Sequence, residues 1–229
     1  MPLYIAIILS GNIELLQKGL TNFKWTYLIF SFLFSFLSYI IRSIRWHLWL
    51  RRLVGERSWK ESFLIYFSGL ALLATPARIG ESVRSVFLKK RYSASYSKTV
   101  PTVFVERFYD ILTIGILSSI AVFFSNINKI IIVIPLVLTL AIVLIIHKKS
   151  FLLSVLNSLS KRKYISKIIP NVIESTDTMY DLIHFKQLIP YTMISLGALL
   201  LDMISYYFLV LGLNMNLNFA ETILIICSS

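Results

Sequence analysis

Long apolar runs separated by short basic segments dominate the pattern of this chain. A helix that crosses the hydrocarbon core of a bilayer needs ~20 mostly apolar residues. Two partial apolar runs lie near the two ends, at Leu3–Leu9 and Phe219–Cys227. The five longer runs are Trp25–Ile41, Ser62–Thr75, Val100–Phe124, Ile130–His147 and Leu188–Leu213. The pattern predicts an all-α fold, a polytopic transmembrane helix bundle that forms a single integral membrane domain over residues 1–229.

The basic residues between these runs predict how the bundle is oriented. Arg42–Lys60 carries six basic residues and one acid, Arg78–Lys98 carries six and one, and Lys148–Gln187 carries seven and three. Lysine and arginine accumulate in the short cytoplasmic loops of membrane proteins. We therefore expect a multi-pass protein of the cell membrane, with all three basic segments in the cytoplasm.

The run Ser62–Thr75 lies between two of these basic segments and is too short for a comfortable crossing. If both flanks are cytoplasmic, a single crossing is excluded. A re-entrant helical hairpin at about residues 61–77, turning between Gly69 and Pro76, is the simplest solution. Non-helical backbone at this depth has to be enclosed by protein or by a wet cavity. The alternative is an ordinary crossing with a misleading charge pattern.

Residues 150–187 alternate apolar and polar positions at helical spacing, with basic residues between two apolar stripes. This pattern is typical of amphipathic helices that lie on the cytoplasmic leaflet, and equally of a helix that packs on the cytoplasmic end of the bundle. The last apolar run, Phe219–Cys227, is at best half the length of a crossing helix. We therefore expect the sequence to be truncated at its C-terminal side.

The composition narrows the classes of function. Of 229 residues 57% are hydrophobic, although the net charge is +12, whereas soluble domains are ~45–50% apolar. The single cysteine, Cys227, excludes an internal disulfide framework. The basic residues lie at the edges of the predicted spans, where anionic lipid explains them better than nucleic acid does.

No enzyme motif stands out in the sequence. It contains no Walker A loop, no Gly-x-Ser-x-Gly and no His-Glu-x-x-His. The three histidines, His47, His147 and His184, are too scattered to suggest a metal site. We expect neither a metal nor another cofactor, and the balance favours a protein that is not an enzyme.

The first of three charged clusters combines a proline, a glycine and a ladder of charges at i, i+3 and i+6: Pro76, Arg78, Gly80, Glu81 and Arg84. The proline breaks the preceding helix and the glycine permits a close approach of the backbone. Arginine is well suited to bidentate contact with phosphate. We predict that Arg78 and Arg84 bind lipid phosphate and that Glu81 holds them in place. The alternative is a cytoplasmic loop with ordinary snorkelling arginines.

The second cluster, Glu106, Arg107 and Asp110, lies inside the start of the third long run. On a helix, the two acids share a face and Arg107 pairs with Asp110 at i, i+3. Charges within a span are costly and usually face a bundle interior or a cavity. Their natural partners are Arg78 and Arg84. The cluster either lines a polar groove or forms a structural ion-pair network that fixes the hairpin against this helix.

Two further features complete the set of candidate residues. Asp202 lies well inside the last long run, where a lone acid faces inward as a polar contact or as part of a pathway. The third cluster, Arg42, Arg45 and Trp46, lies at the inner end of the first long run. Tryptophan and arginine at head-group level are typical of an interface anchor.

These clusters, in this order, resemble the lysylphosphatidylglycerol synthase transmembrane region family, also called flippase-like membrane proteins. The matching motifs are Arg42-x-x-Arg45-Trp46, Pro76-x-Arg78-x-Gly80-Glu81-x-x-Arg84 and Glu106-Arg107-x-x-Asp110. The resemblance runs from about Phe23 to the C-terminus. It implies a polytopic bundle with re-entrant segments that moves or accommodates anionic or aminoacylated lipids. Some relatives carry a soluble aminoacyl-transferase domain after the bundle, and others are associated with polyprenyl-lipid glycan assembly. This sequence carries no such domain, so lipid aminoacylation is not inferred.

Residues and resemblance together predict a lipid-handling protein, with flippase- or scramblase-like translocation of an anionic or modified phospholipid or of a polyprenyl-linked lipid. The expected partners are anionic membrane lipids and a lipid-modifying or glycosyltransferase enzyme, and not nucleic acid. Two alternatives stay open. One is an intramembrane enzyme or enzyme subunit acting on lipid phosphate, with Glu81, Glu106 or Asp110 as general base or metal ligand. The other is a non-catalytic membrane scaffold.

Overall fold

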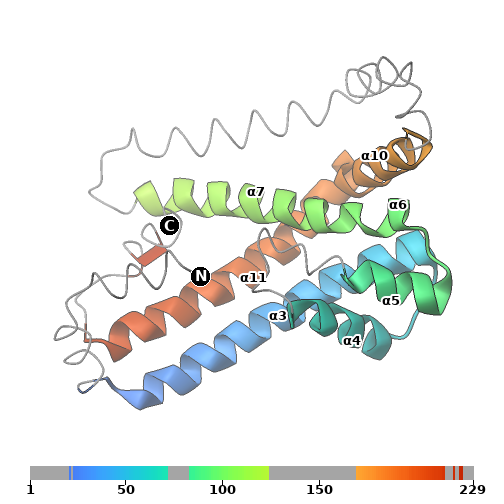
Figure 1. The fold of residues 1–229 in the computed structure, drawn as a ribbon. Coiled ribbons are helices and arrows are strands. Elements are labelled where there is room, and N and C mark those ends of the chain that lie inside the picture. Colours follow the sequence, from blue (N-terminus) through green and yellow to red (C-terminus); the bar gives the residue numbers. More distant parts are fainter. Residues whose placement is uncertain are drawn as a thin grey trace, which may run out of the picture.

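The structure, a computed structural model, describes residues 23–71, 83–123 and 169–214, together with positions 21, 219, 222 and 223. The longer elements of this part are all helices, which confirms the predicted all-α class (Figure 1). They are α3 (Trp25–Val54), α4 (Trp59–Leu70), α5 (Val83–Tyr92), α6 (Tyr96–Thr99), α7 (Pro101–Phe123), α10 (Ile169–Ile183) and α11 (Phe185–Gly212). The predicted span Ile130–His147 and residues 150–168 of the predicted amphipathic region lie outside the described residues.

Helices α3 and α11 are long and apolar enough to cross a membrane, with 30 and 28 residues. At 1.5 Å per residue each exceeds the hydrocarbon core of about 30 Å. They correspond to the first and the last of the five long apolar runs. Large apolar side chains stay exposed along α3, among them Ile29 at 70% and Phe32 at 74%. A surface of this kind is suited to contact with lipid.

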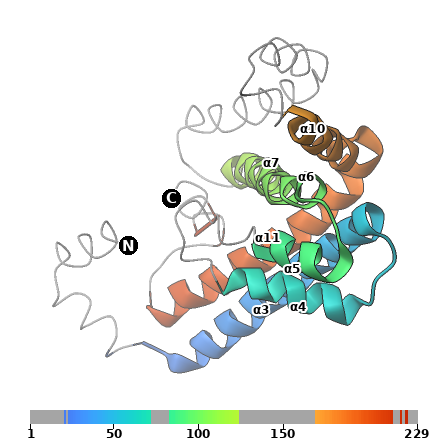
Figure 2. The same cartoon turned by 45° about the vertical axis from the view of Figure 1, so that its right-hand side comes forward.

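Helices α3 and α11 run antiparallel and pack along most of their length, as Figures 1 and 2 both show. Near one end, the backbone N–H of Lys24 donates to the carbonyl of Gly212 at 3.0 Å. Further along, the hydroxyls of Ser31 and Ser205 lie 2.9 Å apart. Small residues at such a contact let two membrane helices approach closely. The antiparallel arrangement agrees with two helices that cross in opposite directions.

Helix α7 runs parallel to α11 and corresponds to the predicted run Val100–Phe124. The rings of Tyr109 on α7 and Tyr191 on α11 are 5.9 Å apart, and Leu117 and Leu199 lie together in an apolar cluster eight residues further on. Proline is tolerated at the first position of α7 because that N–H has no intrahelical partner.

Helices α4 and α5 form an antiparallel pair (Figure 2). Arg91 at the end of α5 pairs with Glu61 in the first turn of α4 at 2.7 Å. At the other end, Gly69 lies against the side chain of Arg84, and a Cβ at this glycine would collide with it. Residues 72–82 between the two helices lie outside the described residues, so the re-entrant hairpin stays a prediction.

The main buried core lies where α3 ends and α7 begins. Trp46 and Trp49 of α3 are fully buried there, together with Tyr109 of α7. Helix α10 packs against the start of α7, and the hydroxyl of Tyr109 donates to the carbonyl of Leu182 at 2.9 Å. Two of the charged residues described next, Arg45 and Arg84, lie against aromatic rings of this core.

Candidate functional site

The guanidinium of Arg42 on α3 joins two carboxylates that come from two other helices. Its Nη1 donates to Oδ1 of Asp110 on α7 at 3.1 Å, and its Nη2 donates to Oδ2 of Asp202 on α11 at 2.7 Å. All three side chains are between 15% and 21% exposed. These three residues, here called the Arg42 centre, tie α3, α7 and α11 together at one point.

Asp110 contacts two further arginines. Nη2 of Arg45 lies 3.4 Å from Oδ1, and Nη1 of Arg107, one turn back on α7, lies 3.0 Å from Oδ2. Arg45 is 1% exposed and also donates to the hydroxyl of Ser195 on α11. Three guanidinium groups therefore stabilise the carboxylate of Asp110. Within the part of the chain that the structure describes, Arg42 is the one ion-pair partner of Asp202.

A second ion pair, between Arg84 and Glu106, is deeply buried beside this centre. Nη1 of Arg84 donates to both carboxylate oxygens of Glu106, at 3.1 and 3.0 Å, and both side chains are at most 2% exposed. The guanidinium lies 4.3 Å from the ring centroid of Tyr66 and 5.1 Å from that of Trp46, a cation–π arrangement. Arg107 lies 3.9 Å from Glu106, which links this pair to Asp110.

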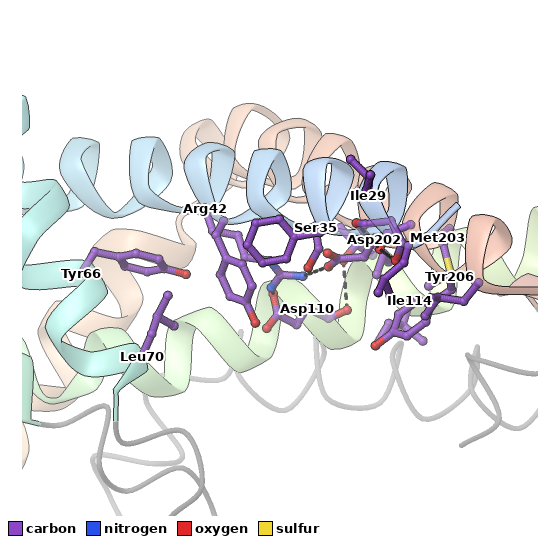
Figure 3. A pocket seen from close by; sticks show the side chains of 18 of the residues that line it. Ile29, Ser35, Arg42, Tyr66, Leu70, Asp110, Ile114, Asp202, Met203 and Tyr206 are labelled. Carbon is purple, nitrogen blue, oxygen red and sulfur yellow. Dashed lines mark hydrogen bonds and ion pairs between the residues drawn. The ribbon is translucent and has the colours of Figure 1, made fainter. Parts of the chain in front are cut away.

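A cavity of about 890 Å³ opens beside the Arg42 centre, between α3, α4, α7 and α11 (Figure 3). Its charged wall consists of the Arg42 centre and Arg107. Hydroxyl groups continue the polar wall: Ser31, Ser35, Tyr39, Thr113, Ser205 and Tyr206. Apolar side chains form the rest, among them Leu28, Ile29, Phe32, Ile114, Leu199 and Leu209. In Figure 3, Tyr66 and Leu70 of α4 lie at one end of this space, and Met203 and Tyr206 of α11 lie at the other.

The four charged residues that line the cavity balance one another: two arginines, Arg42 and Arg107, face two carboxylates, Asp110 and Asp202. The network contains four arginines and three carboxylates: Arg42, Arg45, Arg84, Arg107, Glu106, Asp110 and Asp202. A cavity with two arginines in its wall and apolar side chains beside them suits an amphiphile whose anionic head group competes for the arginine donors. Its volume is also within the ~300–1,000 Å³ typical of small-molecule pockets.

The structure brings five of the predicted site residues into one network: Arg84, Glu106, Arg107, Asp110 and Asp202. Glu106 meets Arg84, one of the two arginines expected to pair with the acids. Arg84 is not among the residues that line the cavity. The other expected partner, Arg78, lies outside the described residues, as do Pro76, Gly80 and Glu81.

The residues predicted as an interface anchor lie inside this network. Arg42 and Arg45 both contact Asp110, and Trp46 is fully buried against Arg84. Sequence reasoning did not connect Arg42 with Asp202. The sequence does contain a signal for this ion pair. An arginine near the end of one apolar run and an acid inside another each need a partner of opposite charge. Sequence reasoning also missed the serine and threonine hydroxyls of the cavity, which are ordinary residues of apolar helices.

Among the described residues, no group of three or more His, Cys, Asp and Glu side chains is arranged to hold a metal ion. The acids of the Arg42 centre are bridged by a guanidinium. The arrangement is suited to binding an anion that competes for arginine donors.

Comparison with known proteins agrees with this picture. Residues 3–228, nearly the whole chain, match the family described as Lysylphosphatidylglycerol synthase TM region. No curated protein and no solved structure matches the chain. The chain therefore belongs to this family, and it is a membrane protein with a lipid-related function.

Proposed function

We propose that this member of the lysylphosphatidylglycerol synthase transmembrane region family translocates anionic lipids, as a flippase- or scramblase-like protein whose head-group site is the cavity at the Arg42 centre. The observation that carries this proposal is a single cavity that has both charged and apolar walls and is lined in part by α3 and α11, the two helices long and apolar enough to span a membrane. Arg42 and Arg107 line the cavity and bind the phosphate. The acyl chains follow the apolar wall.

The polar wall provides a path for the head group along the cavity. From Arg42, Ser35 lies about two helical turns back along α3 and Ser31 about three turns back. Ser205 of α11 lies opposite Ser31. A polar group that enters the hydrocarbon core without hydrogen-bonding partners is costly. Hydroxyls along this route lower that cost for a head group that leaves Arg42.

The border of the cavity allows the acyl chains to stay in the bilayer. Ile29 and Phe32 line the cavity and are also largely exposed on the outside of α3. Tyr206 on α11 lines it as well and is 46% exposed. A lipid can therefore place its head group in the cavity while its chains remain among those of neighbouring lipids. In this proposal the protein is multi-pass, with its basic segments in the cytoplasm.

The proposal assigns different tasks to the arginines. Arg84 donates to Glu106 and is 1% exposed, so it positions Glu106 and, through it, Arg107. Arg42 and Arg107 make the phosphate contact in the described part of the site. Arg78 remains proposed as a further phosphate ligand, held by Glu81, at the predicted turn of the hairpin.

The experiment that tests this function is a translocation assay on the full chain. The protein is reconstituted in liposomes that contain head-group-labelled phosphatidylglycerol, and quenching from outside reports exchange between leaflets. The proposal expects exchange that is faster than in protein-free liposomes and that increases with the amount of protein. Exchange no faster than in protein-free liposomes contradicts the proposal and favours the two alternatives, an enzyme subunit or a scaffold. A partner enzyme that modifies lipid or transfers sugars would then be sought by co-purification.

A further inference from the structure

We propose that Asp202 is a proton-binding site, and that an anionic head group and one proton bind the cavity together, so that lipid movement is linked to proton movement. The inference rests on the proposed function, because it takes the Arg42 centre as the head-group site. It adds a second transported species, the proton, and a residue that carries it.

The two acids of the Arg42 centre are stabilised unequally. Asp110 has arginine nitrogens at 3.1, 3.4 and 3.0 Å, from Arg42, Arg45 and Arg107. Asp202 has one, from Arg42 at 2.7 Å, among the described residues. Nearby cations favour the charged form of a carboxyl group. If Arg42 donates to another anion instead, Asp110 still has Arg45 and Arg107 as partners. Asp202 then has no ion-pair partner among the described residues.

A bound phosphate competes with Asp202 for the same donor. Both need Nη2 of Arg42, which now donates to Oδ2 of Asp202. Two negative charges that share one guanidinium repel each other. Proton uptake by Asp202 removes this repulsion and frees Nη2 to donate to the phosphate. The proton comes from water and adds one positive charge, the phosphate adds one negative charge, and the net charge of the cavity does not change.

Among the described residues around the cavity, Asp202 is the group for which this exchange fits. The other titratable or charged side chains that line the cavity are Tyr39 and Arg42 from α3, Tyr66 from α4, Arg107 and Asp110 from α7 and Tyr206 from α11. Phenols and guanidinium groups keep their protons in neutral water. Asp110 holds three arginine contacts. Glu106 does not line the cavity and is bonded to Arg84.

A route for the proton exists along the same cavity. The side chain of Asp202 is 21% exposed, and the cavity that it lines is large enough to hold water. One turn along α11, Ser205 and Tyr206 also line the space. The proton and the head group therefore enter and leave through one compartment, which is what joint transport requires.

The test counts protons that are taken up when lipid binds. Short-chain phosphatidylglycerol is titrated calorimetrically into the purified full chain in micelles, at one pH, in two buffers with different ionisation enthalpies. The difference in heat gives the number of protons per lipid. In the pH range where Asp202 of the free protein is ionised, the inference expects uptake of close to one proton per bound lipid. In that range the affinity for the lipid should fall about tenfold for each unit by which the pH rises. Asp202→Asn keeps an oxygen that accepts from Arg42, and it is expected to bind lipid with no proton uptake.

Asp181→Asn is the matched control, because it removes a carboxylate that pairs with an arginine of α3, Arg52, outside the cavity. It should keep the proton count of the unmodified protein. Lipid binding without proton uptake overturns the inference, and so does proton uptake that persists in Asp202→Asn. Neither outcome contradicts the proposed function. Failure of the unmodified protein to bind phosphatidylglycerol overturns the head-group site and the inference with it. If the variant does not fold, the two-buffer measurement on the unmodified protein still tests the linkage, because lipid binding without proton uptake overturns it.

Discussion

Arg84 on α5 and Glu106 on α7 form a buried ion pair in which one guanidinium nitrogen, Nη1, donates to both carboxylate oxygens, at 3.1 and 3.0 Å. The pair joins the α4–α5 unit to the helix that carries Asp110. Removal of one partner of a buried pair leaves an uncompensated charge and typically costs ~3–5 kcal/mol. We therefore expect Glu106→Ala, and likewise Arg84→Ala, to destabilise the protein by about this amount, as measured by thermal unfolding in micelles.

The matched control for this pair is Arg51→Ala, which removes an arginine from an exposed pair with Glu56. Exposed pairs contribute little, so this variant should unfold almost like the unmodified protein. Replacement of both buried partners by apolar residues, Arg84→Met with Glu106→Leu, should be less harmful than either single substitution to alanine. Equal and small effects in all variants would contradict the buried ion pair.

The close approach of α4 and α5 predicts that Gly69 does not accept a side chain. A Cβ at Gly69 would collide with Nε, Cγ and Cδ of Arg84, whose guanidinium is held by Glu106. Overpacking of a filled interior typically costs ~1–3 kcal/mol, so Gly69→Ala should lower the unfolding temperature. Gly197→Ala on α11 is the control, because nothing lies within 4 Å of the added Cβ, and it should have little effect. The prediction fails if the two variants behave alike.

The antiparallel contact of α3 and α11 predicts a specific cross-link. The hydroxyls of Ser31 and Ser205 are 2.9 Å apart. In a background in which the single cysteine is replaced by Cys227→Ser, the pair Ser31→Cys and Ser205→Cys should form a disulfide on mild oxidation, as seen by gel mobility. The pair Ser31→Cys and Ser195→Cys should not, because ten residues of helix place Ser195 about 15 Å away along α11. Cross-linking of the second pair alone would mean a different register.

Glu61 predicts a dependence on pH at the α4–α5 contact. Its carboxylate accepts from the hydroxyl of Tyr92 at 2.6 Å and from Arg91 at 2.7 Å, and these two hydrogen bonds lower its pKa below the ordinary 4.5. Because the folded chain favours the charged form, the contact stabilises the protein above that ordinary pKa and is lost as the pH falls through the lowered pKa. The unfolding temperatures of the unmodified protein and of Glu61→Gln should therefore differ at neutral pH and converge in acid. A difference that is constant with pH would contradict this account.

Some of the architecture could be predicted from the sequence because it depends on local spacing. The apolar runs predicted α3, α7 and α11, since a crossing helix needs a continuous apolar stretch. The pairing of Arg107 with Asp110 follows from their spacing of three residues on a helix, and the structure places the two charges 3.0 Å apart.

The Arg42 centre could not be predicted in the same way. Arg42 is 68 residues from Asp110 and 160 residues from Asp202, and no local periodicity connects such positions. Arginine and tryptophan at the end of an apolar run are typical of an interface anchor. The same sequence pattern arises when these side chains point into the helix bundle instead. Which of the two holds depends on how helices pack, and this needs the three-dimensional contacts between α3, α7 and α11.

The central claim, that the Arg42 centre binds the head group of a translocated lipid, is tested most directly by two arginine variants of α3 in the translocation assay. Arg42→Ala removes the arginine that lies in the cavity between Asp110 and Asp202, and Arg52→Ala removes an exposed arginine that pairs with Asp181. We expect exchange of labelled phosphatidylglycerol to fall to the protein-free rate in Arg42→Ala and to stay unchanged in Arg52→Ala, with both variants folded. Exchange in Arg42→Ala as fast as in the unmodified protein would contradict the account.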